Sequence, residues 1–212
     1  MTTLDSSDII KTIKLVCYVW RQEMIPVNKN KNSAKDKVLK LCISAMFAAL
    51  ICVATLVIQV PAPNGGFLNF GDCFILIACW ILGPAYGFAA GGIGSAAADL
   101  MGYPIYAPGT FVIKGLMAVA ASLIAHAFIR KNEKLWLVGH ITGAVAAEGI
   151  MIVGYFFYDS LALGVGVAAA WVNMPFNLMQ GGFGAVLGVI LVQVISRTGI
   201  LKKINPYAVK QW

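Results

Sequence analysis

Long apolar runs separated by short polar segments make up most of the chain from residue 38 onward. About 20 apolar residues in a helix are enough to cross the roughly 30 Å hydrocarbon core of a bilayer. A 35-residue block, Phe67–Met101, is too long for one span, and Gly83-Pro84 divides it into two short helices. The other predicted spans are Val38–Val60, Thr110–Phe128, Leu135–Tyr158 and Ala169–Ser196. The pattern therefore predicts an all-α membrane protein with six transmembrane helices.

The polar ends of the chain divide it into three parts. Residues 1–37 form an N-terminal cytoplasmic or interfacial extension with a basic linker, residues 38–197 the membrane domain, and residues 198–212 a cytoplasmic tail. Within the extension, Asp8–Met24 has apolar residues near helical spacing beside lysines, which is typical of an amphipathic interfacial helix. A disordered leader, or a chain that starts at Met24, fits the same residues.

Charge supports the membrane assignment and orients the helices. Only 12% of the residues are charged, and 59% are hydrophobic. Of the 16 Lys and Arg residues, eight lie in the first 40 residues, three in "RKNEK" and four from Arg197 onward. Because basic loops stay on the cytoplasmic side, both termini are predicted inside. The sixteenth basic residue, Lys114, lies within a predicted span.

Few ionisable residues lie in or beside the spans, and such residues in membranes usually face a bundle interior or a water-filled cavity. They are Asp72, Asp99, Lys114 and Glu148. Small residues recur every fourth position from Gly83 to Ser95, which predicts a closely packed helix face that ends at Asp99. We expect that face to carry Asp99 toward Lys114.

Polar and aromatic residues border the same outer mouth. The loops "PAPNGGFLNFGD" and "GYPIYAPG" contribute amides and tyrosines, and "WVNMPFNLMQGGFG" places two asparagines one helical turn apart. Such groups suit a flat, polar small molecule. The predicted substrate-binding residues are Asn64, Asn69, Asp72, Asp99, Tyr103, Tyr106, Lys114, Glu148, Asn173 and Asn177. A purely structural alternative pairs Lys114 with Asp99 or Glu148, or lets its side chain snorkel outward, and uses the asparagines as interhelical hydrogen-bonding groups.

Motifs for enzymatic chemistry are not found in the sequence. It contains no HExxH, GxSxG or GxxxxGK[ST] segment, and His126 and His140 lie at the predicted cytoplasmic ends without metal-ligand spacing. No catalytic residue, metal or cofactor is therefore predicted. A transporter or binding subunit is favoured, and energy for accumulation must come from an ion gradient or another subunit.

Three ordered segments carry a family resemblance: "PAPNGGFLNFGD", "GPAYGFAAGGIGSAAADLMGYPIYAPGTFVIKG" and "NMPFNLMQGGFG". Over Val38–Ser196 the chain resembles the substrate-binding S component of energy-coupling factor (ECF) vitamin transporters, most closely the branch associated with vitamin B6 or hydroxymethylpyrimidine. The resemblance implies a six-helix protein of the prokaryotic cell membrane that captures a vitamin from outside. It also implies a transmembrane coupling subunit and two cytoplasmic ATPases as partners.

The resemblance also suggests roles for individual residues. Ala45 and Ala49 match the family's AxxxA pattern for docking the coupling subunit. Side-chain chemistry, rather than the resemblance, suggests the remaining roles. Tyr103 or Tyr106 would stack on a pyridoxine-like or hydroxymethylpyrimidine ring, while Lys114 would hold a carboxylate ionised, contact a phenolate or form a Schiff base with an aldehyde. The N-terminal extension departs from the family's usual short form. A stand-alone proton-coupled secondary carrier of a small polar solute and, behind it, a membrane enzyme are the alternatives.

Overall fold

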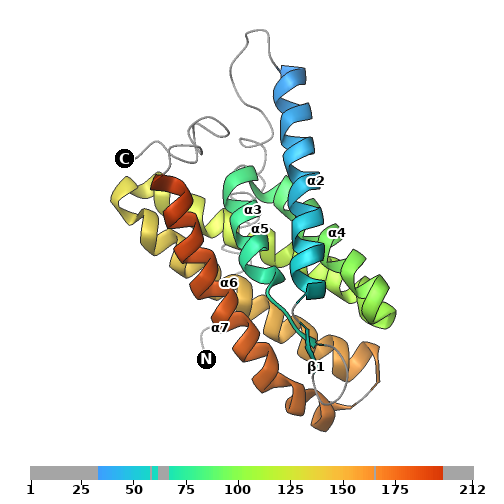
Figure 1. The fold of residues 1–212 in the computed structure, drawn as a ribbon. Helices are drawn as coiled ribbons and strands as arrows, with labels where there is room; N and C mark the ends of the chain where they lie inside the picture. The colour runs from blue at the N-terminus through green and yellow to red at the C-terminus, as the bar shows by residue number, and fades with distance from the viewer. Residues whose placement is uncertain (1–32, 58, 62–66, 165, 198–212) are drawn as a thin grey trace, which may run out of the picture.

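The computed structural model describes residues 33–57, 59–61, 67–164 and 166–197, and within these residues the protein is almost entirely helical (Figure 1). The predicted interfacial helix at Asp8–Met24 and the predicted site residue Asn64 lie outside the described residues. The α-helices are α2 (Ser33–Val57), α3 (Gly71–Leu82), α4 (Pro84–Gly102), α5 (Ala107–Lys131), α6 (Trp136–Phe157) and α7 (Val167–Arg197).

Short elements connect these helices. Strands β1 (Val60–Pro61) and β2 (Phe67–Leu68) pair antiparallel before α3, with Val60 opposite Leu68. Single turns of 3₁₀-helix, η1 (Pro104–Tyr106) and η2 (Glu133–Leu135), lie on either side of α5, and a π-helical turn, η3 (Tyr158–Ala162), extends α6. The sequence predicted a first span that reached Val60, which was wrong at that end, because α2 stops at Val57 and Val60 belongs to the hairpin.

Four stretches of the described chain are long and apolar enough to cross a membrane. They are Lys37–Val57, Pro104–Lys131, Trp136–Ala162 and Val167–Arg197. Helix α3 has 12 residues, about 18 Å at 1.5 Å per residue, which is well short of a hydrocarbon core. The count of six spans and the placement of both termini inside therefore stay predictions.

Helix α3 lies at the centre of the bundle. It packs against α2, α4, α5 and α7, and eleven of its 12 residues are buried. Its sequence has few polar residues because nearly every side chain faces a neighbouring helix. The predicted break after α3 is confirmed: Gly83 adopts φ 85°, which favours glycine, and Pro84 begins α4.

The predicted strip of small residues on α4 packs inward, as expected. A Cβ atom at Gly87 would lie 2.6 Å from Cys79 Cβ of α3, and one at Gly91 would lie 3.3 Å from the carbonyl oxygen of Lys114 on α5. Ser95 and Asp99 follow on the same face and are buried. Close backbone approach through small residues is how helices associate in lipid, and here it brings Asp99 into the protein interior.

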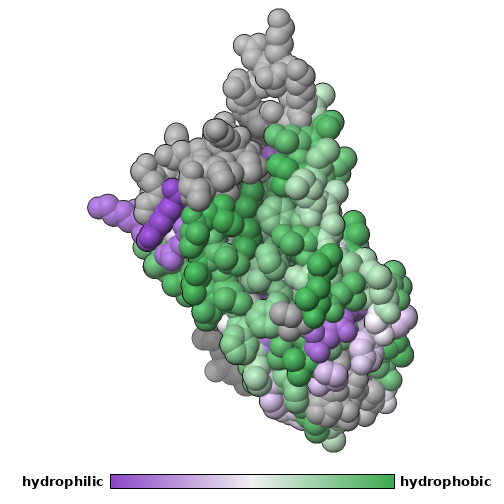
Figure 2. All heavy atoms as spheres, in the orientation of Figure 1, coloured by the Kyte–Doolittle hydropathy of each residue, from purple (hydrophilic) through white to green (hydrophobic). Residues whose placement is uncertain are grey.

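The outer surface is apolar along most of the bundle. Large hydrophobic side chains are exposed on five helices, including Met46, Leu100, Leu116, Val145 and Val186. In Figure 2 the visible face is hydrophobic over α2 and the middle of the molecule, and hydrophilic residues gather near its ends. Apolar surface of this extent on long helices is expected where lipid is the solvent.

Candidate ligand-binding site

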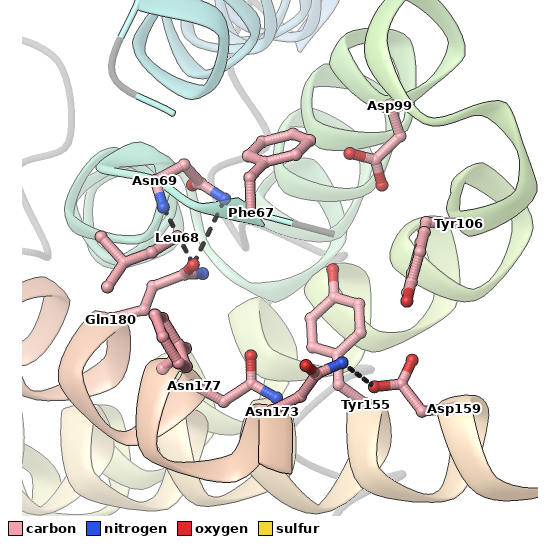
Figure 3. A pocket seen from close by; sticks show the side chains of 11 residues that line it. Phe67, Leu68, Asn69, Asp99, Tyr106, Tyr155, Asp159, Asn173, Asn177 and Gln180 are labelled. Carbon is pink, nitrogen blue, oxygen red and sulfur yellow. Dashed lines mark hydrogen bonds between the residues drawn. The ribbon is translucent and has the colours of Figure 1, made fainter. Parts of the chain in front are cut away.

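A cavity of about 40 Å³ lies among the ends of several elements, close to the β1–β2 hairpin (Figure 3). Strand β2 and the residue after it form one wall, and α4, η1, α6, η3 and α7 form the others. The lining residues are Phe67, Leu68, Asn69, Asp99, Tyr106, Tyr155, Asp159, Asn173, Phe176, Asn177 and Gln180.

Half of the ten predicted substrate-binding residues line this cavity. Asn69 follows β2, Asp99 lies near the end of α4, and Tyr106 ends η1. Asn173 and Asn177 lie one turn apart on α7, as their spacing predicted, and both face the cavity in Figure 3. The fold thus brings these five residues to one site from four separate parts of the chain.

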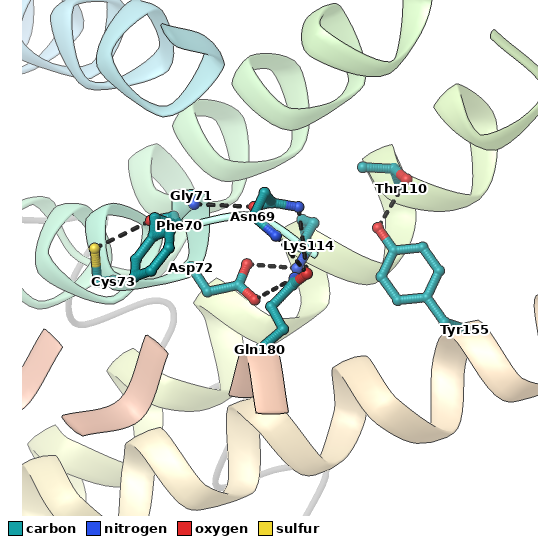
Figure 4. Close-up of polar contacts among 9 residues, drawn as sticks. All are labelled: Asn69, Phe70, Gly71, Asp72, Cys73, Thr110, Lys114, Tyr155 and Gln180. Carbon is teal, nitrogen blue, oxygen red and sulfur yellow. Dashed lines mark hydrogen bonds and ion pairs between the residues drawn. The ribbon is translucent and has the colours of Figure 1, made fainter. Parts of the chain in front are cut away.

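Lys114 does not line the cavity. Its ammonium group forms a buried ion pair with Asp72 of α3, and only 2% of the Lys114 side chain is exposed (Figure 4). The structural alternative, which paired Lys114 with Asp99 or Glu148, was therefore wrong about the partner. Asp99 is carried inward as expected and lies within electrostatic reach of Lys114, but it does not form an ion pair with it among the described contacts. Asp72 lies in the first turn of α3, and it comes within reach of Lys114 because α3 packs directly against α5.

The Lys114–Asp72 pair supports the cavity through Gln180. Gln180 Nε2 donates to Asp72 Oδ2 at 2.7 Å, and Gln180 Oε1 accepts the backbone N–H of Asn69 at 3.0 Å and its side-chain amide at 3.4 Å. Asn69 Oδ1 in turn accepts the N–H of Gly71 at 2.9 Å. The orientation of two cavity amides is thus fixed by a charge pair behind them.

Glu148 also lies outside the cavity lining, although it is buried. It faces α7: a Cβ atom at Gly184 would lie 2.8 Å from both Glu148 Oε1 and Asp72 Cβ. Neither carboxylate oxygen of Glu148 has a hydrogen-bond partner within the described residues. Glu148 is therefore a neighbour of the Lys114–Asp72 pair, rather than a residue that meets the cavity.

The other predicted residues lie farther from the cavity. Tyr103 is half-buried and its ring packs against Phe67, with centroids 5.5 Å apart, although Tyr103 itself does not line the cavity. Ala45 and Ala49 are both exposed on α2. They form part of its apolar outer face.

Sequence reasoning did not select two polar lining residues of α6 and η3, Tyr155 and Asp159. The predicted span ends at Tyr158, one residue before Asp159, whereas the chain continues there as the π-helical turn η3. Glu148, Tyr155 and Asp159 are seven and four residues apart, which places them on one helical face. That spacing was the available signal, and the early end assigned to the span concealed it.

The π-helical turn is held against the cavity by two contacts. Asn173 Nδ2 donates to Asp159 Oδ2 at 3.1 Å, and the Tyr158 hydroxyl donates to the carbonyl oxygen of Ile105 at 2.8 Å. Tyr158 lies over Gly109, where a Cβ atom would come within 2.6 Å of its ring. Single π-helical turns are often found at functional sites, and this one directs Asp159 inward.

The lining combines three kinds of chemistry. Amides from Asn69, Asn173, Asn177 and Gln180 supply donors and acceptors, aromatic rings supply stacking faces, and Asp99 and Asp159 supply carboxylates. The Tyr155 hydroxyl is engaged with Thr110 Oγ1 at 2.8 Å, which fixes its ring. No cluster of His, Cys, Asp and Glu suited to a metal occurs among the residues that the structure describes. The arrangement can bind a small heteroaromatic molecule.

Comparison with known proteins identifies the family. A family model described as "ECF-type riboflavin transporter, S component" matches residues 35–197, which is most of the chain. The chain belongs to the S-component family of ECF transporters. Such S components are membrane-embedded, substrate-binding subunits of vitamin transporters, not enzymes, and they work with a coupling subunit and ATPases. The protein is accordingly a multi-pass protein of the cell membrane.

The chain is also similar to individual proteins. An uncharacterized protein of Pyrococcus woesei is 33% identical over 65% of this chain and 88% of its own length. The thiamine precursor transporter HmpT of Lactococcus lactis is 29% identical over 81% of this chain and 93% of its own length. A solved S component of a bacterial ECF transporter has the same fold, with a TM-score of 0.57 at 20% identity, and the match covers 76% of this chain and 98% of that one.

Proposed function

We propose that this S component captures a small hydroxylated heteroaromatic vitamin or vitamin precursor, with hydroxymethylpyrimidine as the leading substrate and a pyridoxine-like vitamer as the alternative. The main support for this proposal is the cavity, where amides, carboxylates and aromatic rings converge from strand β2 and helices α4 to α7. Amides fit the hydroxyl group and ring nitrogen of such a molecule, and the rings of Tyr106 and Tyr155 fit its flat face. The similarity to a thiamine precursor transporter supports a pyrimidine as the first choice.

Size favours a single heterocyclic ring over a larger vitamin. The cavity holds about 40 Å³, and binding sites for drug-sized ligands enclose about 300–1,000 Å³. Any vitamin must therefore widen the cavity when it binds, and a single ring requires the smallest change. A tricyclic flavin with a sugar-alcohol chain would require the largest, so we place riboflavin behind the two one-ring candidates.

Substrate capture is proposed from the outer side, with both chain ends inside. The extension (residues 1–37) and the tail (198–212) would then lie in the cytoplasm or at its interface, around a membrane domain of residues 38–197 in which α2 to α7 count as the six membrane helices. The basic loop between α5 and α6 would also be inside. The cavity, at the opposite end of α5, would open outward.

Delivery of the substrate is proposed to need a coupling subunit and two ATPases. Ala45 and Ala49 are exposed on one face of α2, where small side chains allow another helix to approach closely. Asn69, Asp99, Tyr106, Asn173 and Asn177 would contact the substrate directly. Lys114 and Asp72 would position the amides from behind, a role that needs no Schiff base.

Mass spectrometry of small molecules released from the purified protein tests the substrate, followed by calorimetric titration with the same compound. Hydroxymethylpyrimidine or a pyridoxine-like vitamer, bound one per chain, is the expected result. Release of lipid or phosphorylated compounds alone would contradict a free-vitamin site. Uptake into vesicles that contain this chain without any ATPase would instead indicate a stand-alone carrier.

A further inference from the structure

Asp159 is a buried carboxylate in the cavity wall, and one of its oxygens accepts no hydrogen bond of normal geometry. Only 2% of the residue is exposed, and Oδ2 accepts a hydrogen bond from Asn173. Oδ1 has no hydrogen bond of normal length and angle within the described residues, and the hydroxyl of Tyr106, another lining residue, lies beside the carboxylate (Figure 3). A buried carboxylate oxygen without a donor is costly, so such atoms usually mark a missing partner. Because Asp159 lines the cavity, a bound molecule can supply that partner.

The cavity contains a second carboxylate and no cation. Asp99 lines it from α4, and Figure 3 shows the Asp99 and Asp159 carboxylates reaching it from opposite sides of Tyr106. None of the described lining residues is Lys, Arg or His. The ammonium group of Lys114 lies 5.5 Å from the ring centroid of the lining residue Tyr155, but it is already paired with Asp72. The field inside the cavity therefore favours positive charge and N–H donors.

We propose that Asp159 is a specificity-determining residue, and that the cavity selects heteroaromatic rings bearing an exocyclic amino group and a ring nitrogen that takes up a proton. The amino group would donate to Asp159 Oδ1, and Asp99 would offset the positive charge of the protonated ring. This inference rests on the proposed function and narrows it to aminopyrimidine-type substrates. A ring with a carbonyl oxygen at the same position would bind more weakly, because two acceptor oxygens would then face each other without a hydrogen bond.

The position of Asp159 is fixed before any ligand binds. Its Oδ2 is held by Asn173, and the turn that carries it is tied to η1 through the Tyr158 hydroxyl. A preorganised acceptor discriminates strongly, because the wrong ligand leaves a buried polar group without a partner. Asn173 itself lines the cavity, so the amide and the carboxylate can contact neighbouring groups of one ring.

Calorimetric titration of the purified full chain with two matched compounds tests the proposal. They are hydroxymethylpyrimidine, which carries the amino group, and its deaminated counterpart, in which a carbonyl oxygen replaces that group. We expect the amino compound to bind at least about tenfold more tightly. One hydrogen bond to a charged group contributes enough binding free energy for a difference of that size. Equal affinity for the two compounds in the wild-type protein would overturn the inference without any variant.

Two variants then locate the selectivity. Asp159→Asn should remove most of the preference for the amino compound, because the new amide has one acceptor oxygen and cannot accept from both Asn173 and the ligand. Ser160→Ala should retain the preference. Ser160 is the matched control because it lies on the same turn, bonds only the backbone oxygen of Phe157 in the described contacts, and does not line the cavity. An unchanged preference in Asp159→Asn would overturn the role of Asp159.

The outcomes separate this inference from the broader function. If pyridoxine binds and neither pyrimidine does, a one-ring vitamin site stands and the aminopyrimidine preference is wrong. If riboflavin alone binds, both the substrate class and the role of Asp159 are wrong, because a flavin is neutral and lacks the amino group. If none of these compounds binds, the proposed function and the inference fail together.

Discussion

At the scale of single residues, Lys114 shows how a charge within an apolar helix can support a cavity that it does not line. Its ammonium group pairs with Asp72, Asp72 accepts from Gln180, and Gln180 accepts from Asn69. Each member is a hydrogen-bonding partner of the next, so three helices and the residue after β2 share one network. Removing the charge of Lys114 should therefore disturb the position of the Asn69 amide.

Lys114→Met should destabilise the protein by about 3–5 kcal/mol, because it leaves the Asp72 carboxylate buried without its cation. Unfolding midpoints in detergent measure the loss. The double variant Lys114→Met/Asp72→Leu should recover much of the stability, since it removes both charges together. A double variant that is no more stable than Lys114→Met would contradict the pairing.

Gln180→Leu should weaken substrate binding more than it weakens the fold. It removes the acceptor of two Asn69 N–H groups and a donor to Asp72, so we expect an affinity loss of about tenfold, equivalent to roughly 1.4 kcal/mol. Gln193→Leu is the matched control, because Gln193 lies on the same helix and does not line the cavity. Equal losses of affinity in the two variants would argue against the network.

Residue spacing could predict part of this site. Asn173 and Asn177 were found because polar residues one turn apart in an apolar helix share a face. The partner of Lys114 could not be predicted, because a helical pattern does not say how deep a neighbouring helix lies. Asp159 was missed for a related reason: a π-helical turn leaves no mark in apolar periodicity, so the helix was ended too early.

At the scale of elements, the fold depends on where helices can approach closely. Apolar runs were sufficient to place α5, α6 and α7 within a few residues, because each is bounded by prolines, glycines or charges. The β1–β2 hairpin was not predicted, since two-residue strands carry no periodic signal. The short length of α3 is likewise explained by its central position, where it meets other helices instead of lipid.

Gly87→Ala tests the contact between α3 and α4. The added Cβ would lie 2.6 Å from Cys79 Cβ, so the helices must separate, at a cost of about 1–3 kcal/mol for overpacking. Gly182→Ala on α7 has no atom within 4 Å of its added Cβ and should be neutral or slightly stabilising. Thermal unfolding of the two variants in the same detergent compares them. A tolerated Gly87→Ala would mean that this contact is looser than described.

At the scale of the whole molecule, orientation decides which side the cavity faces. Helix α5 has 25 residues and is about 37 Å long, so η1 at its start and the basic loop after it lie at opposite membrane faces. The cavity is built at the η1 end. The distribution of basic residues predicts that this end is outside.

Cysteine labelling checks the orientation in a variant without the five native cysteines. A cysteine in place of Ile105, which is exposed in η1, should react with a membrane-impermeant maleimide in intact cells. A cysteine in place of Lys134, in the basic loop, should react only after the membrane is opened. The reverse pattern would place the cavity on the cytoplasmic side and contradict capture from outside.

The position of the bound vitamin is the most direct test of the account. An experimental structure of the protein purified with hydroxymethylpyrimidine should show the ring between Tyr106 and Tyr155, with its amino group at Asp159 and the cavity wider than its present volume of about 40 Å³. Ligand density elsewhere, for example beside His140 at the other end of the bundle, would contradict both the site and the function proposed for it.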